Sequence, residues 1–378
     1  MVRPHIHLSW KPTSKWTSFR TGVSLHSHTS HSRETLDFIP RISSRIPIVR
    51  EAVRFQERRY REANGRDLDY YQCWWTPPLS AREALHLERN QIQNSLKMQP
   101  LVSITDHDNI EAPMLLRVLS EGRDTPISVE WTVPFRHTFF HIGVHNIAPR
   151  RAQERMAALA AFTANPVEGH IEGILAGLAE DPETLIVFNH PYWDEKHFGQ
   201  ELHNRTVQDF VNAYKPYLHA LELNGLRPWT ENKITVGLSQ HSGVPLISGG
   251  DRHGCEPNAL LNVTNAQTFG EFVDEVRNDR RSSVVIMPQY KESFTVRILA
   301  GICDVLRENE GHTLGWTRWS DRVFYRRDNG TIESLSSVFK GDEPIIVKQF
   351  IAMMRLVESR RFKAALRLLP AQSQELTL

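Results

Sequence analysis

The stretch LVSITDHDN, at residues 101–109, joins an apolar run to a cluster of acidic and imidazole side chains. Residues 101–106 have the composition of a buried strand, and TDHD at 105–108 falls where that strand would end. A solvated loop has a similar composition, but in a buried setting these polar groups need partners. We therefore predict a strand that delivers ligand or catalytic groups to its carboxyl end.

Other apolar runs end in the same kinds of side chain. They are LHSH at 25–28, FFHIGVH at 139–145, FNHP at 188–191 and GGDRH at 249–253, and the run ISV at 127–129 is followed by Glu130. Neutral imidazole together with carboxylate suits Zn, Mn or Fe. Because such groups recur at successive strand ends, the sequence predicts a metal centre assembled from distant segments.

Strand-like and helix-like segments alternate along the chain. We predict strands at 21–26, 101–106, 127–132, 138–144, 184–189, 219–224 and 244–249, with 283–287 as a candidate eighth. The predicted helices are 80–98, 150–163, 166–180, 205–215, 230–241 and 269–279. Strand followed by helix, repeated, favours parallel strands covered by helices. In closed sheets of this kind the active site lies at the carboxyl ends of the strands, where these histidines and acids fall.

An insertion interrupts this alternation after the first strand. About 75 residues precede the second strand, far more than a simple crossover needs. Residues 41–66 hold eight arginines and three glutamates, a net charge of +5. Ser80 and Glu83 then have the spacing of a capping box at the start of the helix 80–98. The aromatic residues between these two parts are Tyr70, Tyr71, Trp74 and Trp75.

The C-terminal part of the chain shows no chemistry of its own. Its Asn329-Gly330 pair indicates a type I′ hairpin, and an apolar helix is predicted from about 344 to 366. We expect an N-terminal extension at 1–20, an α/β body at 21–290 that includes the insertion and helix at 40–98, and a mainly helical appendage at 291–378 packed on that body.

The composition is that of an ordinary globular protein. Of 378 residues, 40% are hydrophobic and 24% charged, enough apolar content for one large core. The formal charge of +1 favours neither nucleic acid nor anionic membranes as a partner. No stretch approaches the roughly 20 apolar residues of a membrane span, and no signal-type apolar region opens the chain, so we expect a cytoplasmic protein. Three widely spaced cysteines argue against a disulfide framework.

Several candidate ligands have spacings that bring them together. His26 and His28 are two residues apart, so on a strand both side chains point the same way. Asp251 and His253 repeat this spacing after a Gly-Gly pair that allows close backbone approach. His190 precedes a proline, which ends its strand. Each of these histidines, taken alone, is equally compatible with a polar core or surface group.

Two histidines compete within the run 138–145. His141 lies inside the strand-like part, where a polar side chain needs a partner, whereas His145 lies further along on the same face. We therefore prefer His141 as the ligand and keep His145 as the alternative.

The ordered set HxHTS at 26–30, ITDHDN at 104–109, Glu130, FHIGVHN at 140–146, NHP at 189–191 and GGDRH at 249–253 resembles the PHP superfamily, named for polymerase and histidinol phosphatase. The resemblance covers residues 21–290. It implies a distorted (β/α)7 barrel with two or three Mn, Fe or Zn ions at the carboxyl ends of the strands. It also implies hydrolysis of phosphoesters.

Carried over residue by residue, the resemblance implies three groups of ligands. The first group is His26, His28, Glu130 and Asp251. The second is Glu130, His141 and His190, with Glu130 as the bridge between the ions. The third is His107, His253 and Glu34. Many relatives have Asp or His near the position of Glu34, and His31 and Asp37 are nearby alternatives in this chain.

Such a centre predicts hydrolysis by a hydroxide that bridges the metals, without a covalent intermediate on a side chain. The nearest candidates to protonate the leaving group are Asp106, Asp108 and His253. Recognition of phosphate favours guanidinium groups near the strand ends. The arginines at such positions are Arg33, Arg227 and Arg252.

We expect a phosphoesterase acting on a small phosphorylated substrate, and two alternatives stay open. One is an exonuclease or nucleotidase acting on nucleic-acid ends, because the basic insertion and its aromatic residues could guide and stack a single strand. The same residues are equally compatible with a solvated helix whose aromatic neighbours pack onto the body. The other alternative is a noncatalytic metal-binding regulatory module.

Overall fold

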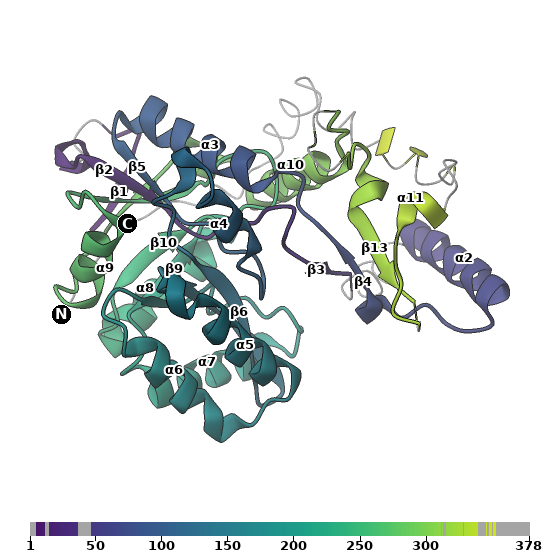
Figure 1. The fold of residues 1–378 in the computed structure, drawn as a ribbon, viewed down its shortest axis with the longest axis horizontal. Coiled ribbons are helices and arrows are strands. Elements are labelled where there is room, and N and C mark those ends of the chain that lie inside the picture. Colours follow the sequence, from purple (N-terminus) through teal and green to yellow (C-terminus); the bar gives the residue numbers. More distant parts are fainter. Residues whose placement is uncertain are drawn as a thin grey trace.

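The computed structural model describes residues 5–11, 15–36, 47–310, 312, 315–327, 329–338, 345, 348–349 and 351–352. The architecture is mixed α/β. Two five-stranded sheets and their helices form a body, and a four-stranded sheet lies apart from it (Figure 1). None of the described helices combines the length and the apolar content needed to cross a membrane.

The first sheet of the body combines predicted and unpredicted strands. Its order is β1 (His5–Leu8), β12 (Ser283–Ile286), β11 (Leu260–Thr264), β2 (Thr21–Ser24) and β5 (Gln99–Val102). The candidate eighth strand at 283–287 is thus confirmed as β12. Neither β1 nor β11 was predicted, and β11 runs antiparallel to both of its neighbours. Pairing of β1 with β12 places part of the predicted N-terminal extension inside the body.

The second sheet carries the remaining predicted strands of the body. Its order is β10 (Leu246–Gly249), β9 (Ala220–Asn224), β8 (Leu185–Phe188), β7 (Thr138–His145) and β6 (Val129–Phe135). The prediction of parallel strands is wrong for β7, which is antiparallel to both β6 and β8. Only Arg136 and His137 separate β6 from β7, and a parallel crossover needs a dozen residues or more.

Helices cover these sheets much as the sequence predicted. They are α3 (Ala81–Gln91), continued by a π-helical turn at Ile92–Leu96, then α4 (Glu111–Leu116), α5 (Ala152–Ala164), α6 (Ile171–Ala179), α7 (Gln200–Tyr214), α8 (Trp229–Ser242) and α9 (Phe269–Arg277). The capping box of α3 is confirmed, with reciprocal bonds between Ser80 and Glu83. The largest apolar cluster joins the second sheet to α5, α6, α7 and α8, with Trp131 wholly buried in it.

Both edge strands of the second sheet approach the first sheet, β10 near the end of β2 and β6 near the end of β5. Among the described residues, isolated parallel bridges pair Ser27 with Arg252 and His107 with Glu130. The amide of Asp108 also donates to the carbonyl oxygen of Glu130 at 2.9 Å. The described strands form separate sheets joined at these points, not one continuous closed barrel, so the seven-stranded barrel stays a prediction.

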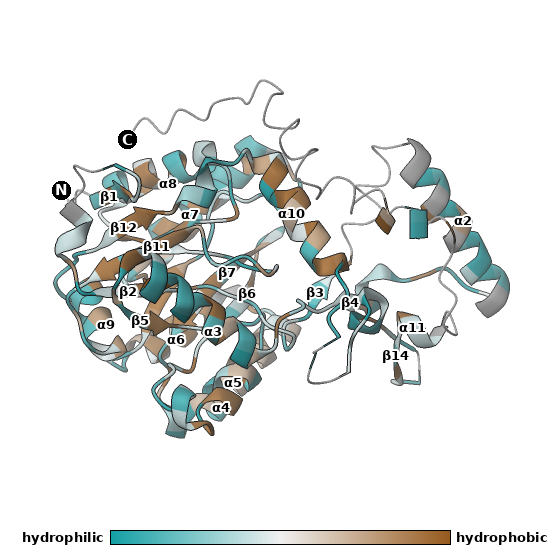
Figure 2. Ribbon diagram, turned by 90° about the horizontal axis from the view of Figure 1, so that it is seen from above, coloured by the Kyte–Doolittle hydropathy of each residue, from teal (hydrophilic) through white to brown (hydrophobic). Residues whose placement is uncertain are grey.

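The insertion and the C-terminal region share one sheet, called here the appended sheet. Its strand order is β14 (Ile332–Ser334), β13 (Val323–Arg326), β4 (Cys73–Trp75) and β3 (Glu34–Thr35). Helices α2 (Pro47–Asn64) and α11 (Leu335–Val338) lie beside it, and α10 (Phe294–Leu306) lies between it and the body (Figures 1 and 2).

The C-terminal region is less helical than expected where it is described. Asn329 and Gly330 lie between β13 and β14, which pair antiparallel, so a hairpin is present as predicted. The predicted type I′ turn on Asn329-Gly330 is wrong, because the amide of Gly330 donates to the carbonyl oxygen of Arg327 at 2.9 Å and Gly330 is therefore the fourth residue of the turn. Most of the predicted helix at 344–366 falls outside the described residues. The appendage therefore contributes two strands as well as α10 and α11, and these strands join the insertion.

Candidate metal centre

The segments that follow β2, β5, β8 and β10, together with strands β3, β6 and β7, bring nine potential metal ligands into one cluster. Glu130 is the second residue of β6 and His141 lies inside β7, so neither is at the carboxyl end of its strand as the sequence analysis expected. Four overlapping groups each have their ligand atoms within 4.8 Å of one another. Together the groups contain His26, His28, Glu34, His107, Glu130, His141, His190, Asp251 and His253. Every residue that the sequence predicted as a ligand lies in this cluster, which could hold metal ions. The assignment of each residue to a particular ion stays a prediction.

The backbone of the cluster is held in an uncommon conformation. His26, His190 and Asp251 have φ angles of 62°, 26° and 55°. The left-handed region is sparsely populated by residues other than glycine, and each such residue costs on the order of 1–3 kcal/mol. The surrounding structure must therefore hold these three residues in place, as it does at many functional sites.

Glu130 on β6 lies at the centre of the cluster. Its Oε2 is 2.9 Å from Nε2 of His26, 3.2 Å from Nε2 of His28 and 3.3 Å from Nδ1 of His107. The same carboxylate faces the other side of the site through Oε1, which lies 3.1 Å from Nε2 of His190. Glu130 thus touches residues from both predicted inner ligand groups, as a bridging ligand would.

Three buried atoms of the cluster show whether its centre suits a cation. Nε2 of His26, Nε2 of His28 and Oε2 of Glu130 are buried, and none has a hydrogen-bond partner in the described part of the chain. Their short separations do not have hydrogen-bond orientation. Because buried polar atoms are nearly always satisfied, three such atoms facing one another match the coordination of a cation. Imidazole with carboxylate is a donor set suited to Zn, Mn or Fe.

Glu34 joins the cluster from the appended sheet. Its Oε2 lies 3.4 Å from Nε2 of His107 and 3.2 Å from Nε2 of His253. Of the two alternatives, His31 has its Nδ1 3.4 Å from Glu111, outside the four groups. Asp37 lies outside the described residues. Glu34 is therefore the acidic residue that the structure brings to the outer group.

The charges of the cluster favour ionised carboxylates. Burial works to raise the pKa of Glu130, but the facing imidazoles of His26, His107 and His141 hold that pKa well below its ordinary value. Burial likewise works to lower the pKa of His26, and the carboxylates around it outweigh burial and raise the pKa well above its ordinary value. The ionised carboxylate is the form that binds metal.

His141 and His145, both on β7, have different neighbours, and only His141 lies in the cluster. Nδ1 of His141 lies 3.6 Å from Oε1 of Glu130, inside the cluster. Nδ1 of His145 instead lies 2.8 Å from Oγ of Ser103. Burial, assisted by the nearby His26, lowers the pKa of His145 to about 3, so this imidazole is a neutral core group. The geometry agrees with the preference for His141.

Glu222 on β9 lies directly behind the cluster and was missed in the sequence. Its Oε1 lies 2.5 Å from Nδ1 of His26, and its Oε2 accepts bonds at 2.9 Å from the amide of His190 and from Nδ2 of Asn224. An acid inside the otherwise apolar run 219–224 was the available signal, since a buried carboxylate needs partners.

Glu88 on α3 is a second buried acid that the sequence did not reveal. It is fully buried and accepts bonds from Oγ of Ser24 at 2.9 Å, from Nε of Arg252 at 3.0 Å and from the amide of Asn258 at 3.2 Å. Helix α3 thus reaches under the loops that carry the ligands.

The structure corrects the prediction that Arg252 binds substrate. Its side chain is 3% exposed, and besides the bond to Glu88 it donates to the carbonyl oxygens of Gly254 at 2.9 Å and of His28 at 3.0 Å. These bonds commit the guanidinium to holding two ligand loops together. Its position between two candidate ligands, Asp251 and His253, could not distinguish this role from phosphate binding.

The other two predicted arginines lie nearer the surface. Arg227 donates through Nε and Nη2 to Glu231, both at 2.8 Å, and its guanidinium stacks 4.8 Å from the ring centre of Trp193. Arg33 is exposed, with its guanidinium 5.4 Å from the ring centre of Trp74. Substrate binding by either arginine stays a prediction.

The three predicted proton donors differ in their surroundings. Asp106 accepts bonds from the amide of Thr29 at 2.6 Å and its hydroxyl at 2.8 Å, and Asp108 accepts one from the amide of Thr132 at 2.9 Å. Burial raises the pKa of both carboxyl groups. Asp106 is fully buried, whereas Asp108 and His253 are partly exposed.

No family model matches the sequence, and no curated protein matches it. Solved structures to which the chain is similar include a two-domain protein from Bacteroides vulgatus containing a predicted PHP-like metal-dependent phosphoesterase, with 10% identity, a TM-score of 0.38, and coverage of 70% of this chain and 64% of that one. A candidate metal-dependent phosphoesterase from Bifidobacterium adolescentis has 13% identity and a TM-score of 0.32, and the match covers 53% of this chain and 91% of that one. An amidohydrolase from Chromobacterium violaceum, with bound sulfate and no metal, has 17% identity, a TM-score of 0.32, and coverage of 47% and 83%. At these scores we base the functional proposal on the side chains of this chain.

Proposed function

We propose that this protein is a PHP-type, metal-dependent phosphoesterase that hydrolyses a phosphomonoester or phosphodiester. The observation that carries the proposal is the convergence of three buried, unsatisfied ligand atoms from His26, His28 and Glu130 at the centre of the nine-residue cluster. A purely structural cluster would be expected to satisfy these atoms internally. Two or three divalent ions are the cofactors that this proposal requires.

Bound ions would supply an activated water and neutralise negative charge on the phosphate. The chain itself would orient the ligands and handle the leaving group. Glu130 presents both carboxylate oxygens to the centre, and Glu222 holds the imidazole of His26 from behind. Of the proposed proton donors, Asp106 is committed to Thr29, and Asp108 and His253 are the two that are partly exposed.

The rim of the cluster favours an anionic substrate. Arg227 stacks on Trp193, whose ring centre is 5.0 Å from that of His190. On another side, the amine of Lys196 lies 4.9 Å from the ring centre of Phe139, which is itself 5.2 Å from His141. Positive groups on two sides of the cluster would attract phosphate oxygens.

Aromatic rings beside the ligands favour a second candidate, a nucleotidase or nuclease acting on nucleic-acid ends. Trp75 and Trp193 lie next to His253 and His190, with ring centres 6.0 and 5.0 Å apart. Exposed faces of such rings stack bases. By contrast, Trp74 stacks on Phe324 and Tyr70 donates to Glu57, so these two members of the predicted aromatic cluster serve packing.

The distorted seven-stranded barrel belongs to the same proposal. Its support is the pair of isolated bridges that join β2 to the end of β10 and β5 to β6, because a ring of seven strands would close at these two edges. Both bridges involve residues of the cluster or their neighbours. The ligands that follow β2, β5, β8 and β10 would then lie at the carboxyl ends of parallel strands of the ring, with Glu130 and His141 beside them.

The proposal is tested by metal analysis together with a substrate panel. Metal-replete protein is expected to hold two or three equivalents of transition metal and, after loading with Mn, to hydrolyse a generic phosphomonoester or phosphodiester. Replacing His26 and His28 with Ala should abolish both metal retention and turnover while leaving the circular dichroism spectrum intact. The matched control is the double change His5→Ala and His7→Ala, a second H-x-H pair on β1 outside the cluster.

Three outcomes separate the alternatives. Less than one equivalent of metal in the wild type would contradict the metal centre itself. Full metal content without hydrolysis of any ester in the panel would favour the noncatalytic regulatory module. Hydrolysis of oligonucleotide ends with a KM that rises steeply with salt would favour the nuclease, whereas a flat salt response would exclude it.

A further inference from the structure

One row of residues runs across the appended sheet to the metal centre. In the register of the sheet, Glu34 on β3 lies opposite Trp75 on β4, and Trp75 lies opposite Val323 on β13. The row ends on the cluster side with the carboxylate of Glu34, 3.2 Å from His253. The ring of Trp75 faces His253 as well, with ring centres 6.0 Å apart. Glu34 and Trp75 therefore reach the outer ligand group directly, and the C-terminal region supports them through β13, which pairs with β4.

Strand β3 is too short to hold this position by itself. It has two residues and pairs with β4, which has three, and a two-stranded ribbon is at best marginally stable in water. Strands β13 and β14 extend the ribbon to four strands. The amide of Thr76 donates to the carbonyl oxygen of Arg322 at 2.9 Å, at the start of the β4 and β13 pairing. The C-terminal hairpin thus completes the sheet that carries Glu34.

The hairpin is in turn fastened to the body. The buried guanidinium of Arg322 donates to the carbonyl oxygens of Val305 at 2.7 Å and Arg307 at 3.0 Å, at the end of α10. Asp304 of the same helix accepts a bond at 2.8 Å from the amide of Cys255, two residues after His253. Through α10 the appended sheet and the loop carrying His253 have a common support.

We propose that the appended sheet is a positioning unit for the outer ligand group, in which the C-terminal hairpin β13–β14 holds Glu34 against His107 and His253. This inference rests on the proposed function, since it assigns the hairpin to the same metal centre. It gives a role to the C-terminal region: without the hairpin, the inner ligands around Glu130 keep their places on the body sheets, and the outer group loses its carboxylate.

Glu34 is also held locally, by a hydrogen bond from the side chain of Ser32. Oγ of Ser32 donates to Oε1 of Glu34 at 2.6 Å, and the amide of His107 donates to the same hydroxyl at 3.2 Å. If this local tether alone placed Glu34, changes in β13 would leave metal binding untouched. If the sheet is required, a change in β13 should act on the outer group from a distance.

Substitutions at Phe324 distinguish support by the sheet from support by the Ser32 tether. Phe324 lies opposite Trp74, its ring packs 5.7 Å from Trp74 and 5.2 Å from Trp316, and strand β4 separates it from β3. Phe324→Ala removes this packing, and Phe324→Pro also removes an amide from the β4 pairing. Ile332→Ala, at an exposed position on the outer strand β14, is the matched control.

The experiment measures Mn bound per full-length chain across a range of free Mn, with electron paramagnetic resonance to count the sites. Glu34→Gln and Phe324→Ala are both expected to weaken only the weakest class of Mn sites, by roughly 10-fold or more, as loss of an orienting partner typically does. Phe324→Pro should remove that class entirely, and Ile332→Ala should match the wild type.

Each result decides between the two supports. Unchanged Mn binding in the Phe324 variants would overturn the inference, and so would an equal weakening of every class of site. Should Phe324→Pro fail to fold, Phe324→Ala carries the test. Failure of the wild type to bind Mn would contradict the proposed function itself, which distinguishes that failure from loss of the positioning role alone.

Discussion

Nδ1 of His26 lies 2.5 Å from Oε1 of Glu222, and this contact leaves Nε2 as the ring nitrogen that points into the candidate metal centre. A carboxylate can only accept a hydrogen bond, so Nδ1 carries a proton, and the lone pair of Nε2 would be left for an ion once metal displaces the second proton of the imidazolium. Nε2 is the atom that lies 2.9 Å from Glu130. The pair is the arrangement by which an outer carboxylate orients a ligating histidine and raises its basicity.

Glu222→Gln is expected to lower metal affinity about 10- to 100-fold, because the neutral amide no longer secures the Nδ1–H tautomer of His26. Competition for Mn or Zn against a chromogenic chelator measures this change. Glu201→Gln, which alters a highly exposed glutamate on α7, is the control and should leave affinity unchanged. Equal affinity in the two variants would show that Glu222 does not orient His26.

Gly249→Ala should destabilise the fold, because an added Cβ would lie 1.7 Å from Oε1 of Glu222 and 2.8 Å from Cβ of His26. We expect a loss of about 1–3 kcal/mol in the free energy of unfolding, measured by urea denaturation. Gly237→Ala on α8 is the control, since nothing lies within 4 Å of its Cβ. That helical change should be stabilising by up to about 1 kcal/mol. A stable Gly249 variant would contradict the close packing.

Glu88→Gln should be strongly destabilising, because it leaves the buried guanidinium of Arg252 without its countercharge. Removing one partner of a buried ion pair costs about 3–5 kcal/mol. A double-mutant cycle with Arg252→Met, followed by urea denaturation, measures the coupling between the two residues, which we expect to be on the order of 1–3 kcal/mol. Additive effects of the two changes would show that the pair does not act as a unit.

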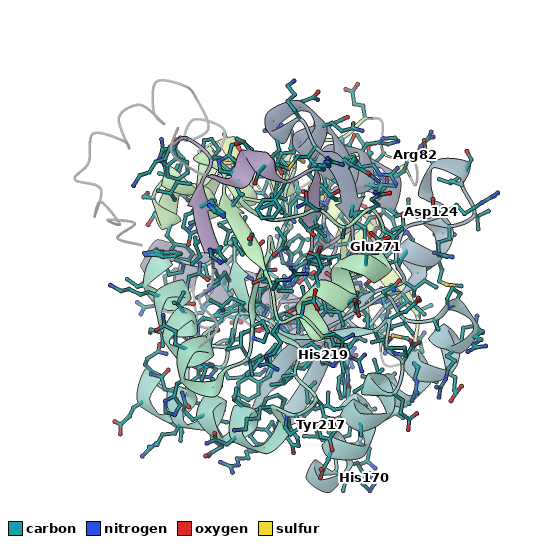
Figure 3. All side chains as sticks on the ribbon, turned by 90° about the vertical axis from the view of Figure 1, so that its left-hand side faces the viewer. Arg82, Asp124, His170, Tyr217, His219 and Glu271 are labelled. Atoms are coloured by element: carbon teal, nitrogen blue, oxygen red, sulfur yellow. The ribbon has the colours of Figure 1, made fainter. Side chains whose placement is uncertain are left out.

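The buried imidazole of His219 is expected to make the folded protein less stable in acid. Its Nδ1 accepts a bond at 3.0 Å from the amide of Ile186, and burial, with a smaller effect of Arg277, lowers its pKa to about 3 (Figure 3). The unfolded chain titrates near 6.5, so between about pH 6.5 and 3 the unfolded state binds the extra proton. Stability should therefore fall as pH drops through this window and be unaffected by His219 above it.

The measurement for His219 is the melting temperature as a function of pH, compared with that of His219→Gln. The variant should lose less stability than the wild type between pH 7.5 and pH 5, since its side chain does not titrate. Identical pH dependence in the two proteins would show that protonation of His219 does not contribute. Other buried histidines are common to both proteins and cancel in the comparison.

Most of the ligands were predictable because they lie in or soon after short apolar runs, whereas Glu34 follows a polar segment and was implied only by the family resemblance. Asp251, for example, comes directly after β10, and a charged group at that point of an apolar strand signals a partner by itself. The same local logic located the capping box of α3 at Ser80. The antiparallel turn between β6 and β7 was also available in the sequence, because two residues cannot form a crossover.

Other residues of the site could not be recognised from the sequence around them. Glu88 sits in an amphipathic helix, where an acid is ordinarily solvated, and only the tertiary contact with Arg252 buries it. Arg252 and Arg227 looked equivalent beside the predicted strand ends. Packing committed Arg252 to backbone carbonyls and left Arg227 at the rim. Side-chain roles of this kind depend on distant segments whose positions no local pattern contains.

The sequence by itself indicated most of the residues that could bind metal and that many of them would follow strands, because strand periodicity and the cost of burying polar groups are local properties. Only the tertiary structure decided what supports them. It brought Glu222 behind His26, set Glu88 under the ligand loops, and joined the insertion to the C-terminal hairpin in one sheet that carries Glu34. These arrangements arise from pairing between segments far apart in the chain, and such pairing depends on the packing of the whole molecule.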